Sequence, residues 1–316
     1  MKAYLARRVV YLLPVWLFVS LLAFGLGRLA PGDPARDVLG RTTGRQPTER
    51  EVVAERHRLG LDRPLPVQYL SWLSGAVRAN LGTSYTTGEP VSQAIGRTLP
   101  ATLQLAGAAF LLAVAIGLPL GLLAAAKSWT WIDHLIRAAA LLGASIPAFW
   151  LGYLLILAFA VRTHLLPAFG PGGPSHLVLP ACTLALFDLA MLARLTRAAV
   201  LETLGGDYIQ TARAKGLREQ QTLVRHALRA ALVPLVTWTG MSFGFLFGYS
   251  VVVETVFAWP GLGYATVLAV QARDYPFLQA FVLLMGTLFV LLNLGVDIAY
   301  TWVDPRLRFG RALAAG

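Results

Sequence analysis

The sequence predicts an all-α polytopic membrane protein with six transmembrane helices, both termini in the cytoplasm and a helical extracytoplasmic cap after the first span. Two observations carry this prediction: the composition and the distribution of charge. Of the 316 residues, 56% are hydrophobic and 14% are charged, whereas soluble domains have about 25% charged residues. The mean hydropathy is +0.62. So few charges could not cover a water-soluble enzyme, and so apolar a chain is not disordered.

Six stretches without Asp, Glu, Lys or Arg have the roughly 20 residues that a bilayer core about 30 Å thick requires. They are residues 9–27, 98–126, 138–161, 163–193 (interrupted by Asp188), 230–253 and 275–296. The fourth opens with a Pro- and Gly-rich segment, so its helix is expected from about Leu177. The first is interpreted as a retained span, because its apolar run is too long for a signal peptide and no small-residue cleavage site follows it.

A seventh uncharged stretch, 255–272, contains Trp259-Pro260-Gly261-Leu262-Gly263 at its centre, which breaks a helix. With six spans, twelve Lys and Arg lie on the side of the termini and two lie in the short loops opposite. The positive-inside rule therefore places both termini in the cytoplasm. A seventh span would move the basic tail outside, so the stretch is interpreted as interfacial or re-entrant.

The charge pattern also bears on other function classes. The net charge of +11 is explained mainly by this topology signal, so no nucleic-acid partner is predicted. The single cysteine, Cys182, excludes a disulfide framework within the chain and is expected to pack as a small hydrophobe. The five histidines are scattered, and no catalytic or metal constellation is expected. Residues 121–128 resemble a nucleotide-binding loop, but Ala126 replaces its second glycine and no strand precedes it.

The predicted organisation has four parts: an N-terminal span (1–30), an extracytoplasmic helical loop (31–97), a five-span core (98–303) and a cytoplasmic tail (304–316). In the outer loop, Thr48 and Glu51 fit a capping box that opens a polar helix to about Leu59. Leu70, Leu73 and Val77 form a helical stripe within residues 67–79. The loop carries no catalytic signature.

The largest predicted cytoplasmic loop, 201–230, has its own structural signals. Asp207 follows two glycines and is a good N-cap for a helix over 208–215, and Gly216 is placed to end it. A second, basic helix is expected over 219–229. A helix of two turns is marginal alone in water. From the residues alone, the loop is either a surface turn or a docking helix for a cytoplasmic protein.

The sequence of this loop, Asp207-Tyr-Ile-Gln-Thr-Ala-Arg-Ala-Lys-Gly-Leu217 followed by residues 225–234, resembles that of ABC-importer permeases of the dipeptide/oligopeptide/nickel branch. The resemblance extends over nearly the whole chain. Further motifs occur in the same order as in that branch: Arg28-Leu-Ala-Pro-Gly-Asp-Pro34, Leu59-Gly-Leu-Asp62, Asn80-Leu-Gly82, Leu99-Pro-Ala-Thr-Leu-Gln-Leu105, Glu254-Thr-Val-Phe-Ala-Trp-Pro-Gly-Leu-Gly263, Arg273-Asp-Tyr-Pro276 and Asp304-Pro-Arg306.

The resemblance implies a transport subunit of a prokaryotic inner membrane that is not itself an enzyme. It implies a second, homologous permease as heterodimer partner, two cytoplasmic ATPase subunits that bind ATP and Mg, and an extracytoplasmic substrate-binding protein. No cofactor is expected in this chain. The short loop helix would dock on an ATPase, and the coupling residues would be Asp207, Tyr208, Thr211, Ala212, Arg213, Ala214, Lys215, Gly216 and Leu217.

Four residues are candidates for the translocation path: Asp188, Glu254, Trp259 and Gly261. Asp188 lies near the middle of an apolar span, where a carboxylate costs about 2.5–3.5 kcal/mol. It either contacts a substrate amine or makes a structural hydrogen bond to a neighbouring helix. Glu254 and residues 259–263 are assigned to an outer gate from the helix break and the resemblance.

Three functions remain open at this point. The first is uptake of dipeptides or oligopeptides delivered by a binding protein. The second is a nickel-chelate or glutathione importer of the same branch, which the short loop at about 162–176 favours to some extent. The third is a stand-alone secondary transporter, for which the sequence lacks the usual paired inverted repeats.

Overall fold

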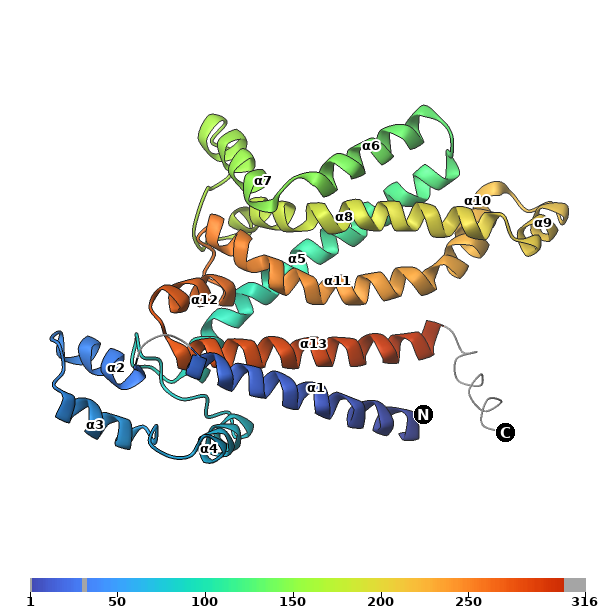
Figure 1. The fold of residues 1–316 in the computed structure, drawn as a ribbon. Helices are drawn as coiled ribbons and strands as arrows, with labels where there is room; N and C mark the ends of the chain where they lie inside the picture. The colour runs from blue at the N-terminus through green and yellow to red at the C-terminus, as the bar shows by residue number, and fades with distance from the viewer. Residues whose placement is uncertain (1, 30–32, 304–316) are drawn as a thin grey trace.

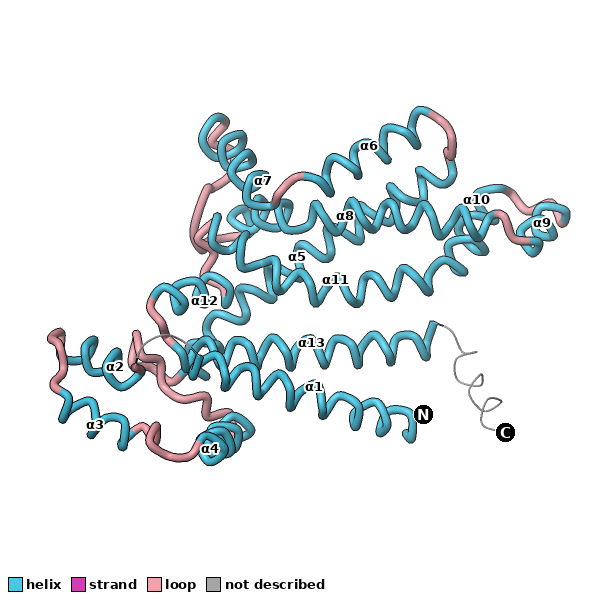
Figure 2. The backbone as a smooth tube through the Cα atoms, in the orientation of Figure 1, coloured by secondary structure: helices cyan, strands magenta, loops and turns pink. Residues whose placement is uncertain are grey.

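The computed structural model describes residues 2–29 and 33–303. The predicted tail, 304–316, lies outside the described residues. Those residues are mostly helical (Figure 2), and an isolated β-bridge joins Thr83 to Pro90. The elements are α1 (Lys2–Leu29), α2 (Pro34–Thr43), α3 (Glu49–Arg58), α4 (Leu65–Val77), α5 (Val91–Ala126), α6 (Trp131–Ser145), α7 (Ala148–Leu155), the π-helix η1 (Ile156–Arg162), α8 (Pro174–Leu204), α9 (Asp207–Ala214), α10 (Glu219–Gln221), the π-helix η2 (Thr222–Ala227), α11 (Leu228–Val256), α12 (Leu262–Gln271) and α13 (Tyr275–Val303).

The long helices α1, α5, α8, α11 and α13 run between the same two ends of the molecule (Figure 1). Helix α9 and the start of α1 lie at one end, here called the α9 end. Helices α2–α4, here called the cap, lie with α12 at the opposite end. Helix α8 packs most extensively on α5, and α1 packs on α13. The elements that could act at either face of a membrane are therefore separated by the length of the bundle.

Several of these helices are long and apolar enough to cross a membrane. They are α5, α8, the continuous η2–α11 segment (Thr222–Val256) and residues Tyr275–Gly295 of α13. The bent pair α6 and α7–η1 qualifies as a fifth if it is counted as one span. Helix α1 contributes a shorter apolar segment, Leu12–Gly27. The fold is thus that of an all-helical, multi-pass membrane protein.

The predicted span over 138–161 is not one continuous helix. The chain bends by 103° between Trp131–Ser145 and Ala148–Arg162. Ile146 is extended (φ −80°, ψ 123°) and precedes Pro147, which begins the next helix. A proline disfavours helical geometry in the residue before it and cannot donate a backbone hydrogen bond. An uncharged run conceals such a break.

Small residues allow the central helices to approach closely. Ala106, Ala109 and Ala113 of α5 are buried. A Cβ atom on Gly121 would lie 2.5 Å from the carbonyl oxygen of Ala193, and one on Gly117 would lie 2.9 Å from that of Leu189. Helices pack in membranes largely through such contacts between small residues. Cys182, by contrast, is exposed and not packed as expected.

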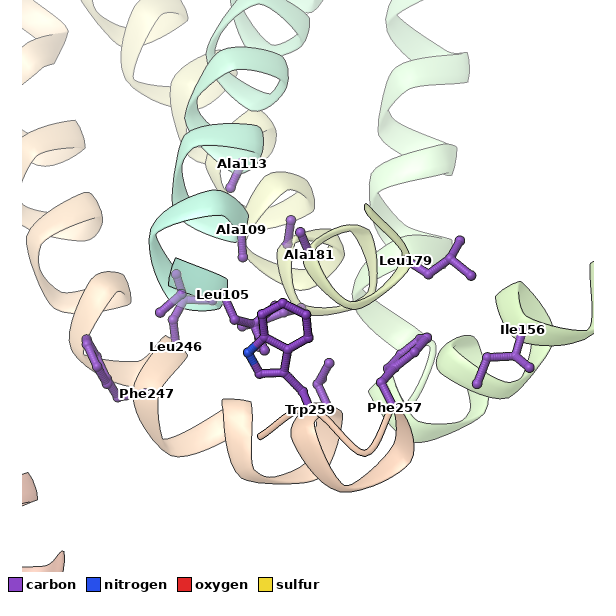
Figure 3. Close-up of a cluster of buried hydrophobic side chains, with 14 residues drawn as sticks. Leu105, Ala109, Ala113, Ile156, Leu179, Ala181, Leu246, Phe247, Phe257 and Trp259 are labelled. Atoms are coloured by element: carbon purple, nitrogen blue, oxygen red, sulfur yellow. The ribbon is translucent and has the colours of Figure 1, made fainter. Parts of the chain in front are cut away.

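Three apolar clusters form the core of the described residues. The first lies toward the cap end, where α5, α7, α8 and α11 meet, and includes Leu105, Leu246, Phe257 and Trp259 (Figure 3). The second lies toward the α9 end and includes Val200, Ile209 and Leu223. The third joins α5, α12 and α13. Both ends of the bundle are therefore fixed by packing.

The cap confirms two local predictions and adds a helix. The capping box of Thr48 and Glu51 is present, and α3 runs to Arg58. Residues 67–79 are helical up to Val77. Helix α2 was not predicted; Asp33 caps it and Pro34 occupies its first turn, a recognised start signal.

Buried polar contacts attach the cap to the bundle. The carboxylate of Asp274 accepts hydrogen bonds from the Ser84 hydroxyl and, at 3.1 Å, from the Tyr85 backbone N–H. The Ser20 and Tyr69 hydroxyls lie 2.7 Å apart and link α1 to α4. The Ser20–Tyr69 contact fixes the cap to α1, and the Asp274 contacts fix the segment between α4 and α5 at a point up to 190 residues away in sequence.

Candidate functional site

The loop 201–230 forms a short helix that projects from the α9 end (Figure 1). Helix α9 begins at Asp207, and Gly206 is its N-cap, with extended backbone angles of φ −76° and ψ 148°. The prediction that Asp207 caps the helix is therefore wrong by one position. Asp207 lies in the first helical turn, where a carboxylate still interacts favourably with the helix dipole.

The end of α9 is a Schellman motif. The Gly216 N–H donates to the Arg213 carbonyl at 2.9 Å, and the Leu217 N–H donates to the Ala212 carbonyl at 3.4 Å. Gly216 has φ +78°, a conformation that glycine adopts without strain. The predicted stop at Gly216 is confirmed, and the chain reverses sharply there.

One face of α9 is anchored to its own chain. Ile209 is fully buried and Ala212 is 7% exposed. Ile209 packs in the second apolar cluster with Val200 at the end of α8 and Leu223 in η2. Sequence reasoning did not assign Ile209 a role, although an apolar pair three residues apart on a polar two-turn helix is the signal for such an anchor.

The opposite face of α9 is exposed. Tyr208 is 49% exposed, and the other predicted coupling residues on this face are Asp207, Thr211, Arg213, Ala214 and Lys215. The predicted coupling residues thus fall into three groups. Ala212 is buried, the residues just named are exposed, and Gly216 and the half-buried Leu217 form the turn that follows the helix.

An exposed ion pair crosses the turn after α9. The guanidinium of Arg213 donates to both carboxylate oxygens of Glu219, at 2.6 and 3.2 Å. This hydrogen bonding lowers the pKa of Glu219 below its usual value. The side chains are 44% and 65% exposed, so the pair contributes little to stability. Its effect is to hold α10 close to the end of α9.

At the opposite end, the helix break predicted at residues 259–263 is present. It covers residues 257–261, between α11 and α12, and Glu254 holds it. This residue is fully buried. Its carboxylate accepts hydrogen bonds from the Thr102 hydroxyl at 2.7 Å and from the Tyr264 N–H at 2.9 Å. The Thr102 hydroxyl in turn accepts from the Leu262 N–H at 2.7 Å. Thr102 and Glu254 therefore accept hydrogen bonds from backbone N–H groups in the first turn of α12. The N-cap residue of this helix, Gly261, has no side chain that could accept them.

The other candidates near this break are also inside the chain. Trp259 is 4% exposed, and its indole N–H donates to the Ala101 carbonyl at 2.9 Å. A Cβ atom on Gly261 would overlap the Glu254 carboxylate. These contacts join α5, α11 and α12. They give Glu254, Trp259 and Gly261 a structural role in this conformation, and their role in a gate stays a prediction.

Asp188 differs from the other candidates. It is 7% exposed, and no hydrogen bond or ion pair to it occurs among the described residues. The hydrogen bond to a neighbouring helix that would make it structural is therefore not present here. Asp188 lies in the span α8, more than 40 residues before Glu254, and the structure does not bring the two together in a hydrogen-bonded network.

Sequence reasoning missed an ion pair between α6 and α8. The Arg197 guanidinium donates to both oxygens of Asp133, at 2.6 and 2.7 Å, and the Trp129 N–H donates at 3.0 Å. Asp133 is fully buried and the Arg197 side chain is 16% exposed. Opposite charges within two apolar helices are the signal for such a pair, because unpaired charges there are costly.

No group of three or more His, Cys, Asp or Glu side chains placed to hold a metal ion occurs in the part of the chain that the structure describes. The arrangement is that of a transport protein: long apolar helices, a short apolar helix, α12, at one end and an anchored polar helix, α9, at the other. These features define the class of membrane permeases.

Comparison with protein families gives a more specific result. The chain belongs to the family described as binding-protein-dependent transport system inner membrane components. The model of that family matches residues 117–309, and the model of its N-terminal region matches residues 1–106.

Similar proteins agree with this membership. A probable peptide ABC transporter permease of Sinorhizobium fredii is 41% identical over 98% of this chain and 100% of its own. A glutathione transport system permease of Escherichia coli K12 is also 41% identical, with the same coverage. Among solved structures, the methionine ABC transporter MetNI in an inward-facing conformation matches 66% of this chain and 96% of its own, with 25% identity and a TM-score of 0.56. The chain is therefore an ABC-importer permease of the dipeptide/oligopeptide branch.

Proposed function

We propose that this permease forms half of the translocation path for peptide-like substrates in a prokaryotic inner membrane. The relatives that support this proposal are named for peptide and for glutathione, which is itself a small peptide. Neither of these two relatives is named for nickel. A nickel-chelate substrate therefore ranks below a peptide.

In this proposal the chain crosses the membrane six times, with α1 and α13 both reaching the cytoplasm at the α9 end. The direction of the helices supports this count. Helix α5 ends at the α9 end, whereas α8 begins at the cap end (Figure 1). The bent α6–η1 segment would therefore connect the two faces and count as one span. The cap would lie outside, beside the binding protein.

The proposed coupling site is the outward face of α9. The observation that carries it is the combination of an exposed polar face with a buried anchor at Ile209 and Ala212. Two ATPase subunits, which would bind ATP and Mg, would contact α9 of this chain and of a homologous second permease. Because Ile209 packs against the ends of α8 and η2, displacement of α9 would be transmitted to those helices. Alternation between inward- and outward-facing states would follow.

The experiment that tests the proposal is purification of the tagged chain in mild detergent with its associated proteins, followed by reconstitution. Recovery of a second permease and ATPases, and ATP-dependent uptake of a peptide, are the expected results. A chain that is recovered alone and transports without ATPases would instead be a secondary transporter.

The Gly216→Pro variant tests the coupling site itself. Proline cannot adopt the φ of +78° at this position, so the Schellman turn should be lost, and uptake per ATP hydrolysed should fall. Gly44→Pro is the matched control, because Gly44 also has a positive φ, of +66°, at a helix end. It lies in the cap and should leave recovery of the ATPases unchanged. Normal coupling in Gly216→Pro would contradict the docking role of α9.

A further inference from the structure

A groove of about 670 Å³ lies between α6, α8 and α11 near the α9 end. Arg194 and Arg197 contribute to it from α8, about 15 and 10 Å along the helix axis from the end at Leu204, at 1.5 Å per residue. This places the groove close to one membrane surface. It is called the arginine groove here, and its lining residues used in the argument are Arg137, Leu141, Met191, Arg194, Leu195 and Trp238.

The arginine side chains of the groove carry more positive charge than the neighbouring carboxylate of Asp133 balances. Asp133 is engaged by Arg197 through two hydrogen bonds. Arg137, one turn from Asp133, also interacts with its charge, but neither Arg137 nor Arg194 forms an ion pair with any described residue. Both are exposed. Three guanidinium groups and one carboxylate leave an excess of two positive charges in the groove.

A further donor in the groove also has no acceptor. The indole N–H of Trp238 is buried and lacks a hydrogen-bond partner within the described part of the chain. A buried N–H without an acceptor costs about 1–3 kcal/mol. Because this N–H is covered by the protein, the polar groups that a ligand in the groove can reach are the unpaired guanidinium groups of Arg137 and Arg194, and both are suited to an anion.

The remaining wall of the groove is apolar. Leu141 of α6 and Met191 and Leu195 of α8 line it beside the arginines. A small inorganic anion would leave this wall without a partner. A phospholipid has both components: a phosphate for the guanidinium groups and an acyl chain for the apolar wall. Basic pockets between helices on the cytoplasmic side of membranes have this chemistry.

We propose that the arginine groove binds one anionic phospholipid of the adjacent leaflet, with its phosphate on Arg137 and Arg194 and an acyl chain along Leu141, Met191 and Leu195. The bound lipid fills the space between the bent α6 and α8, next to the Asp133–Arg197 ion pair. This proposal does not depend on the transported substrate.

The test is native mass spectrometry of the purified full chain with added phosphatidylglycerol or phosphatidylcholine. The wild type should retain one phosphatidylglycerol and no phosphatidylcholine under the same conditions. Arg137→Gln with Arg194→Gln should weaken that binding roughly 30-fold, because each basic residue near an anionic lipid contributes a factor of about five. The matched control is Lys127→Gln with Arg229→Gln, which removes the same charge from exposed positions near the same end and should retain the lipid.

A second pair of variants separates lost charge from lost folding. Arg137→Lys with Arg194→Lys keeps the charge and should restore most of the binding. Equal retention of phosphatidylglycerol by wild type and the double glutamine variant would overturn the proposal, as would equal retention of phosphatidylcholine by the wild type. Displacement of the lipid by free phosphate or by a dipeptide would also overturn it, since the groove would then be a site for a soluble anion or for the transported substrate.

Discussion

At the scale of single residues, the buried carboxylates of the bundle are of two kinds. Asp133 and Glu254 each accept several hydrogen bonds, from a guanidinium in the first case and from a hydroxyl and a backbone N–H in the second. Asp188 accepts none from the described residues. A satisfied carboxylate joins helices, whereas an unsatisfied one is retained at a cost to stability and is a candidate for function.

This contrast predicts opposite effects of the same substitution. Asp188→Asn removes an unpaired charge and should leave the protein equally or more stable while reducing uptake of peptides with a free amine. Asp133→Asn removes the partner of Arg197 and should destabilise by about 3–5 kcal/mol, the usual result of breaking a buried pair. Thermal unfolding in detergent and uptake in vesicles measure the two effects. Unchanged uptake in a stable Asp188→Asn variant would remove Asp188 from the translocation path.

The hydrogen bond that the Thr102 hydroxyl accepts leads to a second prediction about stability. Thr102→Val keeps the side-chain shape but leaves the Leu262 N–H without its acceptor, and a buried unsatisfied donor costs about 1–3 kcal/mol. Thr98→Val is the control, since the Thr98 hydroxyl bonds only within its own helix, to the Ala94 and Ile95 carbonyls. Thermal unfolding should show a clearly lower midpoint for the first variant. Equal midpoints would mean that Thr102 does not hold the start of α12.

At the scale of elements, the sequence predicts helices well where local signals suffice. The capping box before α3 and the stop at Gly216 are both local. The bend at Pro147 is missed because an uncharged run does not show where a helix breaks, and α2 is missed although Asp33 and Pro34 are a local start signal. Contacts between distant helices, such as Thr102 with Glu254, could not be predicted, because they depend on which helix faces pack together.

The anchoring of α9 gives a prediction at this scale. Ile209→Ala should remove apolar contacts that are typically worth about 2–5 kcal/mol in a packed core, more than a two-turn helix can supply by itself. The helix should detach locally while the bundle remains folded. Hydrogen exchange of the amides in residues 209–214 should accelerate, and uptake per ATP should fall. Gln210→Ala, on the exposed face, should change neither quantity, and unchanged exchange in Ile209→Ala would show that α9 is held by other contacts.

At the scale of the whole molecule, composition alone predicts an integral membrane protein, and the charge distribution predicts its orientation. The structure adds which elements lie at which end of the bundle. Helix α9 and the start of α1 lie at one end, and the cap lies at the other (Figure 1). Length and hydropathy identify fewer helices as spans than the sequence predicts, because the pair α6 and α7–η1 is bent and the described apolar segment of α1, Leu12–Gly27, is short. The difference concerns how the bent segment and α1 are counted, and the topology can be measured directly.

The six-span topology predicts that the cap and α9 lie on opposite faces of the membrane. Cys182 is the only cysteine, so a Cys182→Ala background allows single cysteines to be placed at Ser74 in α4 and at Thr211 in α9, both exposed. In intact cells whose outer membrane has been removed, an impermeant maleimide should label Ser74→Cys at once. Thr211→Cys should be labelled only after the inner membrane is permeabilised, because the positive-inside rule retains its basic neighbours in the cytoplasm. Labelling of both from the same side would require an even number of crossings between the cap and α9 and would make the bent α6–η1 segment a re-entrant loop.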